Sequence, residues 1–177
     1  MDKFTIPNAL STSRLILAPL CYLAIMQQAW LVAGLILLLA VATDLADGWL
    51  ARRLGQVTAM GGLLDHGSDA VFVTVTLAAL AAAGIVPAVL PILVILAFTQ
   101  YVLDSKALAG KPLRASRIGR YNGIAYFVLA GFPLLHWGAG LHIVPAVAFY
   151  AAGWLLVAST LISMLDRAIA LLRPTSH

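Results

Sequence analysis

Four aspartates, Asp44, Asp47, Asp65 and Asp69, lie within the stretch DLADGWLARRLGQVTAMGGLLDHGSD, which spans residues 44 to 69. The whole chain has 7 acidic residues, so more than half of them lie in this stretch, between long runs of Leu, Val and Ala. Carboxylate oxygens are the ligands that hard divalent cations such as Mg²⁺ and Mn²⁺ prefer. We therefore expect these four residues, called the aspartate quartet below, to bind metal.

The composition predicts that the quartet lies inside a membrane. Of the 177 residues, 62% are hydrophobic and only 10% are charged, and the mean hydropathy is +0.98. A soluble domain of this size needs more polar surface, whereas apolar runs of about 20 residues are long enough to cross a bilayer. We predict an all-α polytopic integral membrane protein, a single domain over residues 1–177 without a cleaved signal peptide. Its six transmembrane helices are expected near 7–27, 30–54, 58–83, 87–109, 115–137 and 142–172.

The basic residues predict the orientation. With six spans, all 11 Lys and Arg residues lie at or near one membrane face. The opposite connections, 26–30, 83–88 and 135–145, contain none. By the positive-inside rule both termini are cytoplasmic, in a bacterial-type inner or plasma membrane. The net charge of +4 is thus an orientation signal, and no nucleic-acid partner is expected. Cys21, the single cysteine, is expected to be a buried packing residue.

The second and third spans form a hairpin that brings the four carboxylates to one depth. Its turn is centred near Gly55 and Gln56. Counted from there at ~1.5 Å per residue, the quartet lies roughly 12–20 Å into the hairpin. The members on each arm are spaced i, i+3 or i, i+4, so each pair shares a helix face. We therefore expect all four carboxylates to converge between the two helices.

Such a cluster needs positive charge. One ionised carboxylate at mid-bilayer costs about 2.5–3.5 kcal/mol, and neighbouring like charges add to this. Arg52 and Arg53 are expected to contribute, but two arginines cannot ligate every carboxylate oxygen on the deep side. Four negative charges match two divalent ions, Mg²⁺ or Mn²⁺, which is the two-metal arrangement used for displacement at phosphorus. Arg52, near the mouth, is expected to bind a pyrophosphate, while Arg53 fits an orientation role.

The spacing of these residues resembles a known family. Asp44-x2-Asp47-Gly48-x2-Ala51-Arg52-x8-Gly61-x3-Asp65-x3-Asp69 resembles the signature of the CDP-alcohol phosphotransferases, and IPNALSTSR resembles the Pro-Asn…Arg segment that opens their first span. The resemblance implies a six-helix membrane enzyme, usually homodimeric. Such an enzyme displaces CMP from a CDP-linked lipid, here CDP-diacylglycerol, with an acceptor hydroxyl. Its lipid substrate keeps its acyl chains in the membrane.

The same resemblance implies roles for individual residues. The first three aspartates hold the metals and touch the CDP group, and Asp69 both binds metal and acts as the base on the acceptor. The nucleotide site is lined by a further set: Asn8, Asp44, Gly48, Ala51, Arg52 and Gly61.

The acceptor is expected to bind at the basic connection before the fifth span. Arg117 and Arg120 share a helix face and, with Ser116 and Arg114, form a cradle for a phosphate. Glycerol-3-phosphate or inositol phosphate needs such a cradle, whereas serine or choline does not. The run ASRIGR resembles phosphatidylglycerophosphate synthases, which favours glycerol-3-phosphate. The spacer His66-Gly67-Ser68 departs from the Pro-containing spacer of those enzymes. Phosphatidylglycerol, as in cardiolipin synthase, and serine therefore stay open as acceptors.

Two other classes of protein can also bury acids. Divalent-cation transporters and channels carry carboxylates along ion pathways, but their ligands usually come from several broken helices related by repeats. Here the acids lie on one hairpin, and no repeat is visible. A structural scaffold in which the acids pair with arginines is the third possibility, and eight fixed positions at the family's spacing make it the weaker one.

Overall fold

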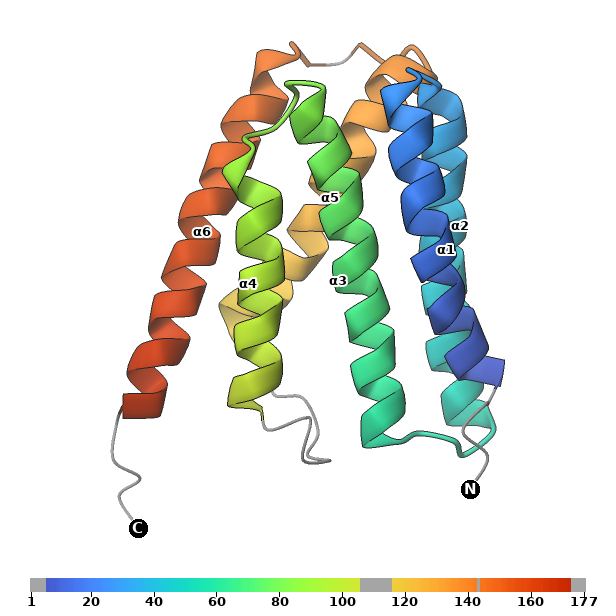
Figure 1. Ribbon diagram of the computed structural model, residues 1–177, viewed down its shortest axis with the longest axis vertical. Coiled ribbons are helices and arrows are strands. Elements are labelled where there is room, and N and C mark those ends of the chain that lie inside the picture. Colours follow the sequence, from blue (N-terminus) through green and yellow to red (C-terminus); the bar gives the residue numbers. More distant parts are fainter. Residues whose placement is uncertain (1–5, 106–115, 143, 173–177) are drawn as a thin grey trace.

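The protein is all-helical over the residues that the computed structural model describes, 6–105, 116–142 and 144–172. Six α-helices follow one another in this part of the chain: α1 Ile6–Met26, α2 Trp30–Arg53, α3 Ala59–Ala82, α4 Val89–Asp104, α5 Arg117–Gly138 and α6 Val147–Leu172. They run up and down the bundle, so that α1 begins and α6 ends at the same end of the molecule (Figure 1). The expected number of helices is confirmed.

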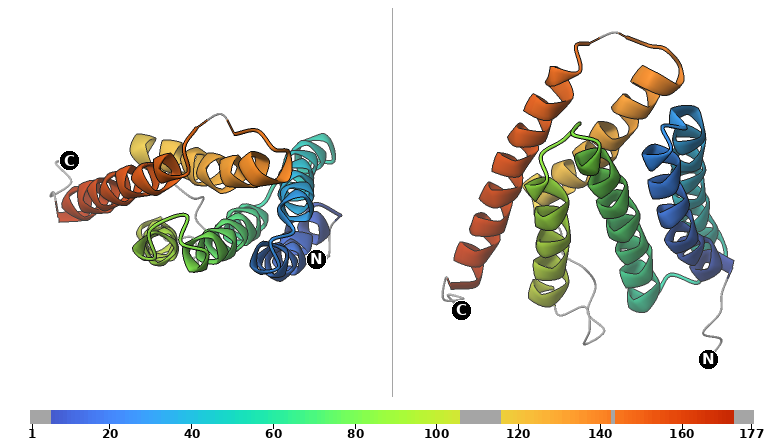
Figure 2. Two further views of the ribbon diagram at one scale, coloured as in Figure 1. Left: turned by 90° about the horizontal axis from the view of Figure 1, so that it is seen from above. Right: turned by 45° about the horizontal axis from the view of Figure 1, so that its top comes forward.

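Seen along the bundle, the helices form two rows closed at one side (Figure 2). Helices α3 and α4 make one row, α5 and α6 the other, and the α1–α2 pair packs across the end. Direct packing joins α1 to α2 and α3, α4 to α3 and α6, and α5 to α2 and α6. Helix α3 is the central element, because its Phe72, Leu77 and Leu80 are fully buried. Its upper half anchors the core, and its lower half carries Asp65 and Asp69.

The outer surface is apolar, as a lipid-facing surface must be. Leu35, Leu38, Leu155 and Leu165 each expose more than half of their surface, although each lies within a helix. Four helices, α1, α2, α3 and α6, are long and apolar enough to cross a membrane, and α4 is a shorter apolar helix. At ~1.5 Å per residue the 16 residues of α4 span about 24 Å. These helices fit an integral membrane protein, and within the described residues four of the six are long and apolar enough for a full span.

The observed helix boundaries agree with the predicted ones to within two residues, except at the end of α4 and the start of α6. Helix α4 ends at Asp104 rather than 109, and the residues from 106 to 115 lie outside the described part of the chain. Helix α5 begins at Arg117 rather than 115, because the side chain of Ser116 accepts a hydrogen bond from the Gly119 amide and caps the helix. Helix α6 begins at 147 rather than 142. A turn with Gly140 at φ 65° and the Pro145 that follows precede it.

The hairpin between α2 and α3 has the predicted turn. Gly55 has φ 65°, and the Gln56 amide donates to the Ala51 carbonyl at 2.9 Å, which closes the end of α2. Thr58 then caps α3, since its side chain accepts from the Gly61 amide at 2.9 Å. The two caps fix where each arm starts, and hence the depth at which the aspartates lie.

Candidate active site

The aspartate quartet converges on a single arginine, Arg14 of α1. Its Nη1 donates to Asp44 Oδ1 and Asp69 Oδ1, both at 2.5 Å. Its Nη2 donates to Asp47 Oδ2 at 2.8 Å and to Asp65 Oδ1 at 2.5 Å. Each terminal nitrogen thus joins one carboxylate of α2 to one of α3. The predicted convergence of four carboxylates at one depth is confirmed by these contacts.

The quartet is deep on one side and open on the other. The Arg14 side chain is 0% exposed and that of Asp47 is 3% exposed, while that of Asp44 is 37% exposed. Ser11, also buried, donates from Oγ to Asp47 Oδ2 at 2.8 Å. Helix α1 therefore forms the closed wall of the site, and ligands can reach the carboxylates from the opposite side.

Arg14 is a site residue to which sequence reasoning assigned no role, although it is the arginine that ends the segment IPNALSTSR. We expected Arg52 and Arg53 to contribute positive charge beside the metal ions, but both are exposed at the end of α2. The guanidinium of Arg53 lies over the Trp49 ring, 4.9 Å from its centroid, which agrees with an interfacial role. The signal in the sequence was the depth of Arg14. It lies eight residues past Ile6, within a membrane helix, where an ionisable residue marks a functional site by default.

The carboxylates suit a hard divalent cation. Ligand oxygens of Asp44, Asp47 and Asp65 all lie within 4.8 Å of one another. Octahedral Mg²⁺ binds oxygen at about 2.0–2.1 Å, so small side-chain adjustments bring these atoms to coordination distance. Asp69 lies outside this group of three but shares Arg14 Nη1 with Asp44. The donor set consists of oxygen atoms alone, which fits Mg²⁺ or Mn²⁺.

Two glycines of the hairpin, Gly48 and Gly61, lie close to side chains that the family pattern or its opening segment contains. A Cβ atom at Gly61 would lie 3.0 Å from Thr58 Oγ1 and 3.4 Å from Asn8 Oδ1, so the starts of α1 and α3 meet closely there. A Cβ at Gly48 would lie 3.5 Å from Arg52 Nη1. Asn8 and Arg52 are thus each placed beside one of the glycines that the family pattern contains. Ala51, one turn before Gly55, is half-buried.

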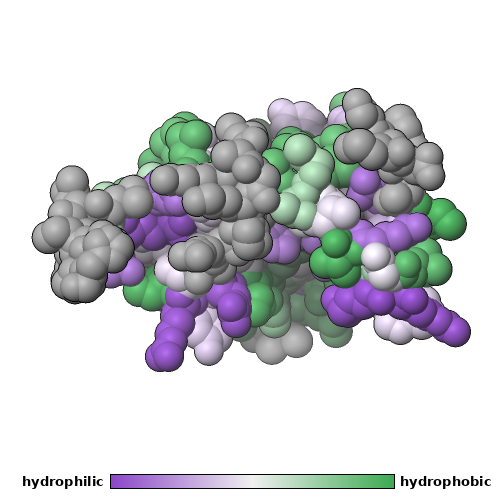
Figure 3. Space-filling model, turned by 90° about the horizontal axis from the view of Figure 1, so that it is seen from below, coloured by the Kyte–Doolittle hydropathy of each residue, from purple (hydrophilic) through white to green (hydrophobic). Residues whose placement is uncertain are grey.

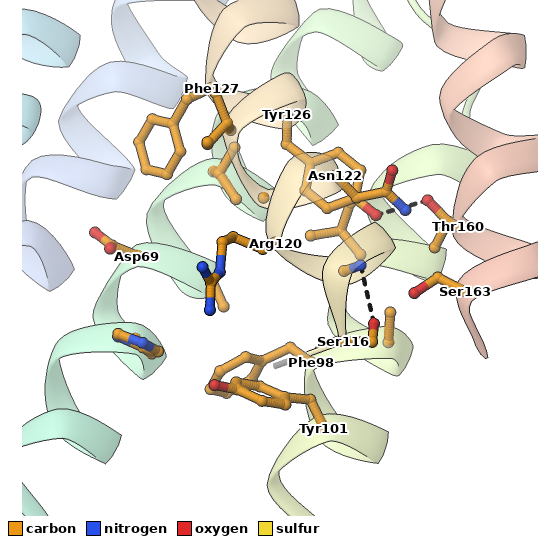
Figure 4. A pocket seen from close by; sticks show the side chains of 18 of the residues that line it. Asp69, Phe98, Tyr101, Ser116, Arg120, Asn122, Tyr126, Phe127, Thr160 and Ser163 are labelled. Carbon is orange, nitrogen blue, oxygen red and sulfur yellow. Dashed lines mark hydrogen bonds between the residues drawn. The ribbon is translucent and has the colours of Figure 1, made fainter. Parts of the chain in front are cut away.

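A cavity of about 560 Å³ opens beside the quartet. Asp44, Asp69 and His66 line one side, and Ser116 and Arg120 line another. The side chains of Asp69 and Arg120 both point into it, from α3 and α5 respectively (Figure 4). Apolar side chains of three helices, α3, α4 and α5, form much of the remaining wall: Ala70, Val73, Val94, Ala97, Phe98, Ile124 and Phe127. The cavity thus joins a carboxylate, a guanidinium and an apolar recess.

The structure does not bring the other two residues predicted to bind the acceptor into the described cavity lining. Arg117 is exposed and is not among the residues that line the cavity. Arg114 lies outside the described part of the chain. Seen from below, hydrophilic side chains gather on this end of the molecule between apolar ones (Figure 3).

An aromatic and charged wall closes the cavity near α4 and α6. The rings of His66 and Tyr101 stack with centroids 6.5 Å apart, and the Arg167 guanidinium lies 5.1 Å from the Tyr101 centroid. Arg167 Nε donates to Asp104 Oδ2 at 3.2 Å. His66 Nδ1 lies 3.3 Å from Asp65 Oδ2, so the wall connects to the quartet. Sequence reasoning did not place Arg167 or Tyr101 here, because both come from helices without a recognisable pattern.

Polar contacts between α5 and α6 form another part of the lining. Tyr126 Oη and Thr160 Oγ1 lie 2.6 Å apart, and Ser159 Oγ donates to Asn122 Oδ1 at 2.6 Å. Tyr126, Thr160 and Asn122 line the cavity (Figure 4). Hydrogen bonds between buried side chains hold these two helices in one register.

Comparisons with known proteins show which family the chain resembles over most of its length. The family model described as CDP-alcohol phosphatidyltransferase matches residues 4–166. A CDP-diacylglycerol–glycerol-3-phosphate 3-phosphatidyltransferase of Aquifex aeolicus is 42% identical over 67 residues, 38% of this chain. This chain spans only 38% of that relative's length. A cardiolipin synthase (CMP-forming) of Streptomyces coelicolor is 33% identical over 168 residues, which cover 85% of this chain and 75% of the relative.

Proposed function

Because the chain belongs to the CDP-alcohol phosphatidyltransferase family, we propose that it transfers a phosphatidyl group from CDP-diacylglycerol to an acceptor hydroxyl and releases CMP. The favoured acceptor is glycerol-3-phosphate, which makes the protein a phosphatidylglycerophosphate synthase. The observation that carries this proposal is the cavity in which Asp69 of the quartet and Arg120 both lie. A reactive carboxylate and a cation for an acceptor phosphate are thereby placed in one recess.

The quartet has two roles in this reaction, metal binding and proton acceptance. Two bound Mg²⁺ or Mn²⁺ ions would neutralise the diphosphate and make CMP a good leaving group. Asp44, Asp47, Asp65 and Asp69 would hold these ions through carboxylate oxygen. Asp69, which lines the cavity, accepts the proton of the acceptor hydroxyl as that oxygen bonds to phosphorus and the bond to CMP breaks.

The nucleotide lies on the open side of the hairpin. Gly48, Ala51 and Gly61 give it room, and Arg52 and Asn8 offer a charged and an amide group beside the glycines. Asp44, the most exposed carboxylate of the quartet, faces the same side and contacts the CDP group. Lipid acyl chains stay in the bilayer while the headgroup enters the site.

The acceptor phosphate lies near the start of α5. Arg120 and Ser116, which line the cavity, make the inner contacts. Arg117 and Arg114 extend the positive charge toward the mouth, where they attract a phosphorylated alcohol. A guanidinium binds phosphate through two parallel hydrogen bonds, which suits a small dianionic acceptor.

Phosphatidylglycerol is the second candidate acceptor. The Streptomyces relative that matches most of this chain is a cardiolipin synthase. The apolar recess beyond Asp69, with Val73, Val94 and Phe127, could take part of a lipid acceptor. The same chemistry then joins two lipids.

The remaining features of the proposal concern the whole protein. The chain acts as a single domain over residues 1–177, works as a homodimer, and lies in a bacterial-type inner or plasma membrane. Its active site opens to the cytoplasm, since the described basic residues of α2, α5 and α6 lie at the ends that share one face of the bundle.

Parallel assays with four acceptors test the proposal. Purified protein in detergent receives CDP-diacylglycerol with glycerol-3-phosphate, inositol phosphate, serine or phosphatidylglycerol, and both CMP and the lipid product are measured. We expect CMP release and phosphatidylglycerophosphate with glycerol-3-phosphate alone. Cardiolipin as the sole product would replace the favoured acceptor with the second candidate. Flux of divalent metal into proteoliposomes without CMP release from any acceptor would contradict the family chemistry for this chain.

A further inference from the structure

Arg14 makes more contacts within the quartet than a side chain that an incoming ligand could displace. Its guanidinium bonds one oxygen of every aspartate in the set, two on α2 and two on α3. The side chain is 0% exposed, and its helix packs directly against both α2 and α3. The arginine therefore lies on the closed side of the site, opposite the entry side.

Moving the Arg14 guanidinium away from the quartet would leave its charge unpaired. Within the described part of the chain, the buried Arg14 Nε has no hydrogen-bond partner. Turning Nη1 and Nη2 away from the carboxylates would leave an unpaired cation among apolar side chains, which costs several kcal/mol. Divalent ions that enter from the open side must therefore share the carboxylates with Arg14.

Sharing is possible because Arg14 uses only half of the carboxylate oxygens. It contacts Asp44 Oδ1, Asp47 Oδ2, Asp65 Oδ1 and Asp69 Oδ1. The second oxygen of each carboxylate makes no contact with the arginine in these hydrogen bonds. A carboxylate can accept from a guanidinium with one oxygen and bind a cation with the other.

We propose that Arg14 is a fixed counter-cation that stays in the quartet when metal binds, and that it limits the protein to one tightly bound divalent ion until a nucleotide diphosphate arrives. This rests on the metal site of the proposed function. With Arg14 in place, the four carboxylates and the guanidinium carry a formal charge of −3. One divalent ion brings the site to −1, and a second brings it to +1, which the diphosphate of the substrate then offsets.

The group of three aspartates identifies where the first ion binds. Asp44, Asp47 and Asp65 offer oxygens within 4.8 Å of one another, and Asp69 is outside this group. The second ion is the one nearer Asp69 and the cavity, at the edge where substrate phosphates enter. Arg14 is thus a positioning residue that makes binding of the second ion depend on the substrate.

Manganese binding tests the proposal without any turnover. Calorimetric titration of the full chain in detergent with Mn²⁺, with and without CDP, gives the number and affinity of bound ions. For the wild type we expect one tight ion without CDP and two with CDP. Arg14→Gln removes the positive charge and should bind the second ion at least about tenfold more tightly without CDP. Arg53→Gln, a change of an exposed arginine over Trp49, should behave as the wild type.

Several results would overturn the proposal. These are two equally tight ions on the wild type without CDP, an unchanged second affinity in Arg14→Gln, or a folded Arg14→Gln that binds no ion. If Arg14→Gln fails to fold, Arg14→Lys keeps the charge and should keep one tight ion without CDP. The number of ions that the wild type binds with and without CDP tests the proposal without either variant. CMP release plays no part in these readouts, so failure of the proposed transferase reaction is detected separately.

Discussion

At the scale of single residues, Arg120 and Arg117 are both exposed but differ in whether they line the cavity. Both lie in the first turn of α5, yet of the two only Arg120 lines the cavity beside Asp69. A hydrogen bond to a charged group contributes about 1.5–3 kcal/mol, equivalent to roughly a 10–150-fold change in affinity. Arg120→Gln should therefore raise the apparent KM for glycerol-3-phosphate at least about tenfold.

Matched variants make this comparison specific. Arg117→Gln removes a charge that does not line the cavity, and should change the same KM less than about threefold. Arg53→Gln controls for loss of surface charge and should leave KM unchanged. Equal effects of Arg120→Gln and Arg117→Gln would contradict the placement of the acceptor phosphate in the cavity.

The residue scale also shows what sequence could and could not predict. The convergence of the aspartates followed from helix geometry, because two pairs at i, i+3 and i, i+4 across a hairpin must share one depth. Arg14 did not follow, because this arginine within the first span was counted only among the basic residues that predict orientation. Its partners are 30 to 55 positions away in the chain, and no local spacing reveals such contacts. Arg167 and Tyr101 likewise contact residues far away in the chain, so no local spacing predicted their positions.

At the scale of helices, close contact between α2 and α5 holds the end of the bundle opposite the quartet. A Cβ atom at Gly138 would lie 2.8 Å from the Leu31 amide nitrogen and 2.9 Å from the Trp30 carbonyl carbon. These are backbone atoms, so the two helices would have to move apart. The rings of Trp30 and Trp137, with centroids 5.2 Å apart, pack in the same contact.

Gly138→Ala tests this contact. Overpacking typically costs about 1–3 kcal/mol, which corresponds to a decrease of roughly 3–10 °C in the apparent Tm. Thermal unfolding in detergent measures it. Gly62→Ala is the matched control, because nothing lies within 4 Å of its Cβ position, and it should leave Tm unchanged or slightly higher. Equal Tm values for the two variants would show that α2 and α5 do not meet closely here.

Sequence predicted the existence of the helices better than their ends. Long apolar runs identify a membrane helix by their hydrophobicity, and the Gly55 turn identified the hairpin. The start of α6 was placed too early because the 142–146 connection is itself apolar, so hydropathy could not distinguish turn from helix. Caps such as Ser116 depend on a single side-chain hydrogen bond and are less visible in composition.

At the scale of the whole molecule, one face of the bundle is specialised for chemistry. The quartet, the exposed arginines of α2 and α5, and the cavity all lie in one half of the bundle. In this half α1 and α5 begin and α2, α4 and α6 end. The opposite half is a largely apolar core around α3. This division fits an enzyme that takes a lipid from the bilayer and a polar acceptor from one aqueous side. Sequence predicted the division through the distribution of Lys and Arg, but not the shape of the cavity, which residues of five helices, α2 to α6, line together.

The central claim is that the aspartate quartet, held by Arg14, works by binding divalent metal, and one measurement tests it most directly. CMP release from CDP-diacylglycerol is followed in EDTA and then with added Mg²⁺ or Mn²⁺, for the wild type, Asp65→Asn and the exposed control Asp166→Asn. We expect no release in EDTA, recovery with either metal in the wild type and in Asp166→Asn, and a loss of at least about 100-fold in Asp65→Asn. Release at the wild-type rate in EDTA, or by Asp65→Asn, would contradict the account.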